Sequence, residues 1–347
     1  MNTISSGSGR PVELHIDVSA SVPLPAPLVI AASLYLPDPA KLAATPVVLF
    51  AAPGGGYSRG YFDLHFEGRS GYSQAEYHAA RGTIVVAYDH LGVGDSTTRH
   101  NNSLTVEMIA DANHAMVTDV LSHLATGGIR PGFPAIPNAC VIGVGQSMGA
   151  GVTIVMQGRH RTFNAVAILG VSAIHTQLPQ ATPEAARRSR VNFMFTRATP
   201  NEQLSVPNSA SNIADFKYPF HWDDLPQDIL DADMQGGYPI RTSAPYFGSA
   251  TIPVCAVAMN SPGYFTPEAA MIEVPVFIGV GERDVCPNPW AEPSAYWNSK
   301  DVSLYVVPRM AHMHNFASSR ELLWRRLDRW SAIVSDGVSR RSGATAS

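Results

Sequence analysis

The chain has 347 residues, a formal net charge of −4 and a pI near 6.3. A slightly acidic chain without a basic patch is not typical of proteins that bind nucleic acid or an anionic membrane. Hydrophobic residues make up 45% and charged residues 15% of the sequence, which predicts a large core. The length suits one large α/β domain with an insertion, or two domains.

The N-terminal residues and the cysteines indicate a reducing compartment. Residues 1–11 are polar and rich in glycine, and they lack the apolar segment of a secretory signal. The three cysteines, Cys140, Cys255 and Cys286, form no C-x-x-C pair. No apolar stretch approaches the roughly 20 residues that a membrane-spanning helix needs. We therefore expect a cytoplasmic protein that does not insert into a membrane.

The first part of the chain predicts strands and helices in alternation. Strands are expected at 12–20, 28–36, 47–51 and 83–88, and helices at 71–80 and 103–125. The first two strands alternate apolar and polar residues and predict an antiparallel hairpin at the edge of a sheet. The second helix has apolar residues at helical spacing and ends before Gly127-Gly128, a typical helix stop.

A short apolar strand at 140–144 meets a predicted helix at 150–157 through the sequence G-Q-S-M-G. Only a very tight turn fits between the two elements, and it strains the backbone of its central residue, Ser147. Such a turn leaves no room for side chains at Gly145 and Gly149. We predict a nucleophile elbow, with Ser147 exposed at the end of a central strand and a helix N-terminus behind it.

The second half of the chain breaks this alternation and then resumes it. A buried strand is expected at 165–171, and residues 172 to about 267 are rich in proline, asparagine and aromatic residues. A structureless loop of this length is improbable, so the segment is interpreted as a small inserted domain. Strands at 274–280 and 302–307 and a helix at 318–334 complete the chain. The order predicts a mainly parallel sheet covered by helices on both faces.

Three side chains follow predicted strand ends in the order Ser147, Asp284, His312. A serine hydroxyl becomes a good nucleophile when a neutral imidazole accepts its proton and a carboxylate orients that imidazole. Glu282 is the alternative acid, because it lies nearer the strand. The pair His312 and His314 is also compatible with half of a metal site, but no H-E-x-x-H motif supports this alternative. We therefore expect no metal and no cofactor.

The chain resembles the α/β-hydrolase family in four places: 145–149 (elbow), 89–96 (D-x-x-G-x-G-x-S), 281–284 (acid loop) and 308–312 (proline-to-histidine spacing). The resemblance implies structural roles for Asp89 and Ser96. It also implies a core at 1–171 and 271–347 and a cap at 172–270. The chain departs from the family pattern at Pro53, where a histidine is usual, and at Ala311, where a glycine is usual.

The expected function is that of a serine hydrolase acting on a carboxylic ester, lactone or thioester of a small hydrophobic molecule. The N–H groups of Met148 and of the loop residues Gly55, Gly56 or Tyr57 are expected to bind the oxyanion. Four aromatic residues of the insertion are candidates for substrate binding: Phe195, Tyr218, Phe220 and Trp222.

Other functional interpretations remain open or are disfavoured. The same fold also serves hydrolysis of carbon–carbon bonds, and it can serve as a ligand-binding protein with an idle triad. The arginines at 187, 188 and 190 are interpreted as a solvated face in preference to a site for an anionic substrate. The nucleotide-binding patterns G-x-G-x-x-G after a strand and G-x-x-x-x-G-K-[ST] are absent from the sequence, which disfavours a nicotinamide enzyme.

Overall fold

The computed structural model describes residues 3–5, 11–191, 195–204, 213–238 and 241–344, and these residues form one nine-stranded sheet. Its order is β1-β2-β3-β5-β4-β6-β7-β8-β9. The strands are β1 (Thr3–Ser5), β2 (Val12–Asp17), β3 (Val29–Tyr35), β4 (Val47–Ala52), β5 (Ile84–Tyr88), β6 (Cys140–Gln146), β7 (Ala165–Leu169), β8 (Val276–Arg283) and β9 (Val302–Ala311). The strands from β5 to β9 in this order are parallel, whereas β1, β2 and β3 pair antiparallel.

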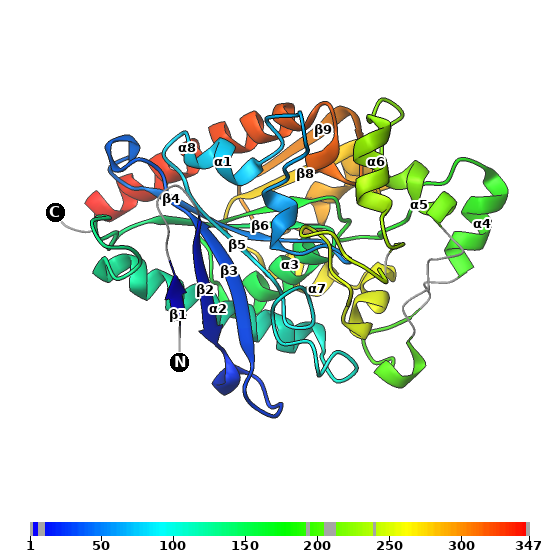
Figure 1. Ribbon diagram of the computed structural model, residues 1–347, viewed down its shortest axis with the longest axis horizontal. Coiled ribbons are helices and arrows are strands. Elements are labelled where there is room, and N and C mark those ends of the chain that lie inside the picture. The colour runs from blue at the N-terminus through cyan, green and yellow to red at the C-terminus, as the bar shows by residue number, and fades with distance from the viewer. Residues whose placement is uncertain (1–2, 6–10, 192–194, 205–212, 239–240, 345–347) are drawn as a thin grey trace.

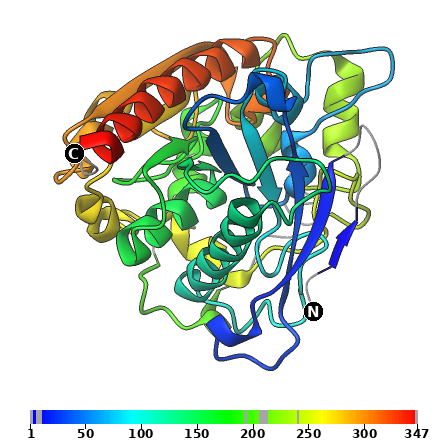
Figure 2. The same ribbon diagram turned by 90° about the vertical axis from the view of Figure 1, so that its left-hand side faces the viewer.

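Helices cover both faces of the sheet. The helices of the described residues are α1 (Gln74–Ala79), α2 (Val106–Thr126), α3 (Met148–His160), α4 (Pro183–Val191), α5 (Ile213–Phe220), α6 (Gln227–Met234), α7 (Thr266–Met271) and α8 (Arg320–Ala344). Helix α8 lies along one face of the sheet and α2 along the opposite face (Figures 1 and 2). This arrangement confirms the predicted α/β fold with a mainly parallel sheet covered on both sides.

The central strands are apolar along their whole length because both of their faces are buried. In β4, Val48 and Phe50 point into the core formed with α2 and α3, whereas Val47, Leu49 and Ala51 point into the core formed with α1 and α8. Successive strand residues face opposite sides of a sheet, so an uninterrupted apolar run serves two cores at once.

The long helices begin and end where local hydrogen bonds cap them. The Thr105 hydroxyl accepts a hydrogen bond from the N–H of Met108, and Gly127 ends α2 with φ of 73°, which confirms the predicted stop. Helix α8 continues ten residues beyond the predicted end at 334. Ser335 and Ser339 donate hydrogen bonds to Thr45, so polar contacts hold a stretch that the apolar pattern does not reveal.

The predicted N-terminal hairpin forms, but it is not at the edge of the sheet. Strands β2 and β3 pair antiparallel as expected, and β3 pairs with β5 on its other side. The three-residue strand β1 adds to β2 on the outside and becomes the edge. The prediction was wrong on this point because a three-residue segment is too short to show alternation.

Residues 172–270 contribute no strand to the sheet in the part of this segment that the structure describes. Helices α4, α5 and α6 lie at the right of Figure 1, beyond the main body of the sheet. The last part of the segment packs against α3, with Met259 and Phe265 in the same core as α2 and α3. Phe220 and Phe247 join the opposite core. The boundaries of this segment as a separate domain stay a prediction.

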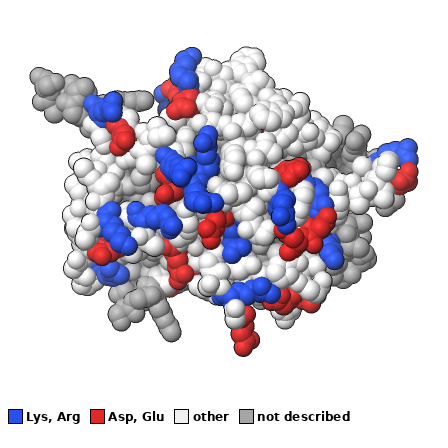
Figure 3. Space-filling model, turned by 90° about the horizontal axis from the view of Figure 1, so that it is seen from above, with Lys and Arg blue, Asp and Glu red and all other residues white. Residues whose placement is uncertain are grey.

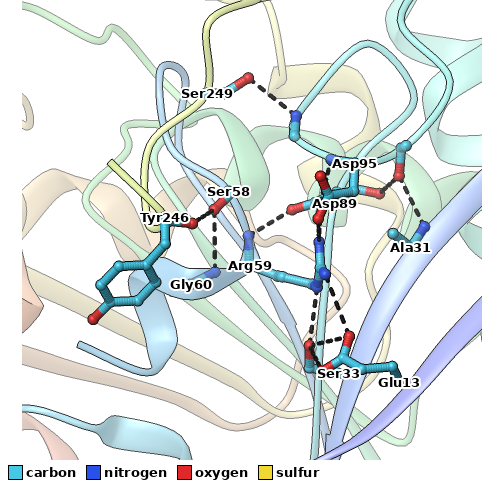
Figure 4. A network of polar contacts seen from close by, with 12 residues as sticks. Glu13, Ala31, Ser33, Ser58, Arg59, Gly60, Asp89, Asp95, Tyr246 and Ser249 are labelled. Carbon is cyan, nitrogen blue, oxygen red and sulfur yellow. Dashed lines mark hydrogen bonds and ion pairs between the residues drawn. The ribbon is translucent and has the colours of Figure 1, made fainter. Parts of the chain in front are cut away.

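A buried ion pair braces the turn that follows β5 (Figure 4). Asp89 is fully buried and accepts hydrogen bonds from the backbone and side chain of Arg59, both at 2.6 Å, and from the N–H of Asp95 at 2.9 Å. The Ser96 hydroxyl donates to the Asp89 carbonyl and accepts from the N–H of Ala31. These contacts support the structural roles that the family resemblance implied for Asp89 and Ser96.

Charged side chains of both signs lie close together on the face seen in Figure 3, in small mixed groups separated by uncharged surface. Within the described residues, no helix has both the length and the apolar character needed to cross a lipid bilayer.

Candidate active site

The residue between β6 and α3 has an unusual backbone conformation. Ser147 has φ of 53° and ψ of −118°, in a region that side-chain-bearing residues rarely adopt. Its N–H donates to the carbonyl of Leu169 on β7 at 2.8 Å, and its carbonyl accepts from the N–H of Gly151 at 3.0 Å. These bonds hold the strained turn in place, as the elbow interpretation requires.

Two glycines allow this turn to form. A Cβ atom at Gly149 would lie 2.2 Å from the carbonyl oxygen of Ala52, and one at Gly145 would lie 2.4 Å from the Cα of Ala150. Both contacts are with backbone, which cannot move aside as the end of a flexible side chain can. The expectation that these positions leave no room for side chains is confirmed.

The structure brings Ser147, His312 and Asp284 together from the ends of β6, β9 and β8. Ser147 Oγ lies 2.9 Å from His312 Nε2, and His312 Nδ1 lies 2.7 Å from Asp284 Oδ1. An ionised carboxylate only accepts hydrogen bonds, so Nδ1 carries the imidazole proton and Nε2 presents its lone pair to the serine hydroxyl. This is the tautomer that removal of the serine proton requires.

The Asp284 carboxylate is buried and fully hydrogen bonded. It accepts from the N–H groups of Val285 at 2.7 Å and Gly281 at 2.8 Å in addition to two imidazoles. Burial alone would raise the pKa of the Asp284 carboxyl, but His314 and His312 hold it well below its usual range. The rival acid Glu282 is exposed and accepts a hydrogen bond from the N–H of Arg309.

The second imidazole on Asp284 belongs to His314, whose Nε2 lies 2.7 Å from Oδ2. This contact was not predicted from the sequence. The contact also concerns the alternative interpretation of His312 and His314 as half of a metal site, because both imidazoles are hydrogen bonded to the Asp284 carboxylate. Among the described residues, the cluster with ligand spacing is Asp63, His65 and Glu76, which contains neither histidine.

The inserted segment and the elbow strand fix the backbone of the histidine loop. The N–H groups of His312 and Met313 donate to the carbonyls of Pro219 and Phe220 at 3.1 and 2.9 Å. Gln146 Nε2 donates to the carbonyl of His312 at 2.9 Å. The contribution of Gln146 was missed, because a glutamine before the serine carries no signal of a partner 166 residues away.

The glycine loop after β4 lies against Ser147. Gly55 lines the cavity beside Ser147 and Met148, and a Cβ atom at Gly54 would lie 3.1 Å from the Cβ of Ser147. The N–H of Tyr57 donates to the carbonyl of Gly54 at 3.2 Å. The Tyr57 N–H is thus used to close the turn of the loop, and the role of Tyr57 in binding the oxyanion stays a prediction. Gly56 is not among the residues that line the cavity.

A buried histidine braces this loop from behind. His90 Nδ1 lies 2.9 Å from Asn113 Nδ2, and His90 Nε2 lies 3.3 Å from the carbonyl oxygen of Pro53. Burial lowers the pKa of His90 to about 4, so the ring is neutral near pH 7. The amide donates to Nδ1, which leaves Nε2–H to hold the Pro53 carbonyl.

A buried charge network ties the insertion to the glycine loop. The fully buried Asp233 lies 2.7 Å from His221 Nε2 and 3.2 Å from Arg241 Nη2, and it accepts the Tyr57 hydroxyl at 2.8 Å. The Tyr238 hydroxyl donates to the carbonyl of Gly55 at 2.8 Å. Burial and Asp233 raise the pKa of Tyr57 well above its ordinary value, so its hydroxyl remains a donor. None of these roles was predicted.

A cavity of about 130 Å³ opens above Ser147 and His312. Most of its wall is apolar and comes from the insertion, including Phe216, Phe220, Tyr238, Ile252, Met259 and Phe265. Thr176 and Asn260 add polar groups. None of the described residues that line the cavity is an aspartate, glutamate, lysine or arginine. The cavity has the apolar walls and sparse polar groups of a small-molecule site.

Only one of the four aromatic candidates lines this cavity. Phe220 does so, with its ring centre 5.2 Å from that of His312. Tyr218 and Trp222 lie outside the lining, because the guanidinium of Arg283 lies 4.0 and 4.7 Å from their ring centres. Phe195 is also outside it and packs partly buried against the core of α2 and α3.

The arginines of α4 were interpreted as a solvated face. Arg187 is exposed and forms an ion pair with Glu184 on the same helix. The side chains at positions 188 and 190 lie outside the described residues.

Comparison with known proteins shows the family. The model of the Alpha/beta hydrolase family matches residues 47–324, so the chain belongs to this family. A comparison with curated proteins finds no match.

Solved structures show the same fold at low identity. A soluble variant of monoglyceride lipase from Saccharomyces cerevisiae is similar with a TM-score of 0.62 and 14% identity, over 95% of this chain and 97% of that one. A thermophilic esterase from Thermogutta terrifontis is similar with a TM-score of 0.59 and 16% identity, over 93% of this chain and 99% of the esterase. A proline iminopeptidase from Mycobacterium smegmatis is similar with a TM-score of 0.57 and 17% identity, over 89% of this chain and 96% of the peptidase. The family and these neighbours indicate a hydrolase.

Gly149→Ala is expected to destabilise the protein by about 1–3 kcal/mol, because the new methyl group overlaps the backbone of Ala52. Gly337→Ala is the matched control in α8, where a Cβ atom has open space. This control should be stabilising by about 0.5–1 kcal/mol, the usual helix preference for alanine. Urea unfolding of both variants measures the difference. Equal stabilities would mean that the elbow does not press against β4.

Asp233→Asn is expected to lower the free energy of unfolding by about 3–5 kcal/mol, because the buried guanidinium of Arg241 loses its carboxylate. Asp231→Asn on the exposed side of α6 is the control, and it should change stability by about 0.5 kcal/mol or less. Thermal and urea unfolding report both. A loss at Asp233 no larger than at Asp231 would contradict a structural role for the network.

Proposed function

We propose that the chain is a serine hydrolase that cleaves a carboxylic ester, lactone or thioester of an uncharged hydrophobic small molecule. The observation that carries this proposal is the continuous hydrogen-bonded series from Ser147 Oγ through His312 to Asp284. It lies at the floor of a cavity, on a backbone turn strained in the manner of a nucleophile elbow.

In the acylation step, Ser147 Oγ attacks the acyl carbonyl while His312 Nε2 accepts the serine proton. Asp284 keeps the imidazole in the correct tautomer and stabilises the imidazolium that forms. The proton then passes from His312 to the leaving oxygen or sulfur, and an acyl-enzyme remains on Ser147. In the second step, His312 removes a proton from water, which attacks the acyl-enzyme. The acid is released when the bond to Ser147 Oγ breaks, and His312 returns the proton to that oxygen.

The negative charge of each tetrahedral intermediate needs hydrogen-bond donors beside Ser147. Met148 is the first residue of α3, and its N–H is one of the helix N-terminal N–H groups with no partner inside the helix. Gly55 lies next to it on the cavity wall. The Gly54 carbonyl is bonded to Tyr57, and this fixes the plane of the peptide that carries the Gly55 N–H. These two N–H groups are the proposed oxyanion hole.

The cavity supports an uncharged acyl group. A buried carboxylate or ammonium group of a substrate needs a charged partner, and the lining offers none among its described residues. A substrate with a free amino terminus, as an iminopeptidase requires, would lack such a partner too. The lining therefore favours an ester-type bond in an apolar molecule over a peptide bond at a charged terminus.

Ser147→Ala is expected to reduce turnover on the order of 10⁴- to 10⁶-fold, because it removes the group that forms the acyl-enzyme. Ser103→Ala, at an exposed serine before α2, is the control and should keep full activity. Hydrolysis of a p-nitrophenyl ester measures both. More than a few per cent of the original activity in Ser147→Ala would exclude this mechanism.

A panel of p-nitrophenyl esters of rising chain length, with aromatic lactones, tests the proposed substrate class. Each methylene group that enters the apolar cavity should contribute up to roughly 1 kcal/mol to kcat/KM, which is several-fold per carbon, until the cavity is full. Esters that carry a carboxylate in the acyl chain should be poor substrates. A flat profile, or preference for acetate, would mean that the cavity does not select by hydrophobicity.

A further inference from the structure

The imidazoles of His312 and His314 are both hydrogen bonded to Asp284, and the proposed reaction uses only that of His312. His312 Nδ1 and the N–H of Val285 share Oδ1, each at 2.7 Å. His314 Nε2 at 2.7 Å and the N–H of Gly281 at 2.8 Å share Oδ2. Each carboxylate oxygen thus has two partners, and His314 is as close to Asp284 as His312 is.

His314 presents one ring nitrogen to Asp284 and buries the other. The side chain is 1% exposed, and its Nδ1 atom has no hydrogen-bond partner among the described residues. An ionised carboxylate only accepts hydrogen bonds, so Nε2 carries a proton and donates it to Oδ2 of Asp284.

The surrounding loop fixes the position of His314. The N–H of Asn315 donates to the Tyr61 hydroxyl, and the Asn315 side chain donates to the Tyr61 carbonyl, both at 3.1 Å. The indole N–H of Trp324 donates to Asn315 Oδ1 at 2.9 Å. His314 is therefore a preset donor that does not have to reorganise during a reaction.

We propose that His314 is a positioning residue that acts through Asp284: its Nε2–H holds the second carboxylate oxygen and weakens the pairing of Asp284 with the proton of His312. A carboxylate with fewer donors binds its remaining donors more strongly, and it would stabilise the imidazolium form of His312. His312 would then stay protonated at higher pH and would be unable to accept the Ser147 proton. This inference rests on the proposed function. It adds that His314 sets the pH range in which His312 can act as the base.

Other titratable groups face the same carboxylate. Burial raises the pKa of Tyr61 and of the Cys286 thiol, which both lie near Asp284, so both stay neutral in the range of an assay. Glu292 is a neighbour of Cys286, and Asp233, which pairs with His221, is a neighbour of Tyr61. All of these groups are unchanged by a substitution at position 314, so a comparison of variants at that position isolates the effect of the donor.

The test compares His314→Gln with His314→Leu in pH profiles of kcat/KM on the best ester of the panel. The amide nitrogen of glutamine is separated from Cβ by the same number of bonds as Nε2 of histidine, so it retains a donor, whereas leucine removes it. For His314→Leu we expect the midpoint of the acidic limb to rise by roughly one pH unit. This makes kcat/KM about tenfold lower on that limb, with convergence toward the unaltered protein at high pH. His314→Gln should keep the original midpoint.

A purely structural role predicts a different result. Loss of packing alone would lower kcat/KM by the same factor at every pH and leave the midpoint unchanged in both variants, and this outcome would overturn the proposal. His314→Met, with an unbranched side chain, repeats the test if the leucine variant does not fold.

A substrate-independent measurement separates this inference from the proposed function. Titration of the His312 ring by NMR in the free protein should show the same shift to higher pH in His314→Leu and none in His314→Gln. If no ester is hydrolysed but the shift is present, the proposed function fails and the role of His314 stands. If esters are hydrolysed and the shift is absent, the role of His314 fails alone.

Discussion

The strained backbone of Ser147 is the constraint on which the rest of the site depends. A residue with φ of 53° persists only where its surroundings hold it, and here β6 is paired with β4 on one side and β7 on the other. Gly149 brings α3 against the end of β4 at Ala52. Because the glycine loop leaves β4 directly after Ala52, the same contact sets the distance between Ser147 and the proposed oxyanion donor at Gly55.

The remaining parts of the site are shared between the sheet and the insertion. Asp284 and His312 follow the ends of strands β8 and β9. The loop that contains His312 is fixed by hydrogen bonds to the backbone carbonyls of Pro219 and Phe220, which belong to the insertion. The insertion also supplies most of the cavity wall and the buried Asp233 network. The insertion is therefore part of the framework of the site as well as its cover, and its loss would disturb the positions of Ser147 and His312.

The sequence predicted those features that depend on local patterns. The fold follows from apolar runs alternating with amphipathic helices, and Ser147, Asp284 and His312 could be located because each follows a strand end. The contacts of His314 and Gln146 could not be predicted, since both depend on how separate loops meet. Aromatic content alone likewise could not separate Phe220, which faces the cavity, from Tyr218 and Trp222, which lie beside Arg283. The edge strand β1 was missed because it is too short for periodicity.

The most direct test of the central claim is covalent labelling of the folded protein with a fluorophosphonate, followed by intact-mass measurement and peptide mapping. A serine reacts with this reagent only when a base activates it. The account predicts one adduct per chain, located on Ser147, and its loss in His312→Ala. Absence of an adduct in the unaltered protein, or an adduct on another serine, would contradict it.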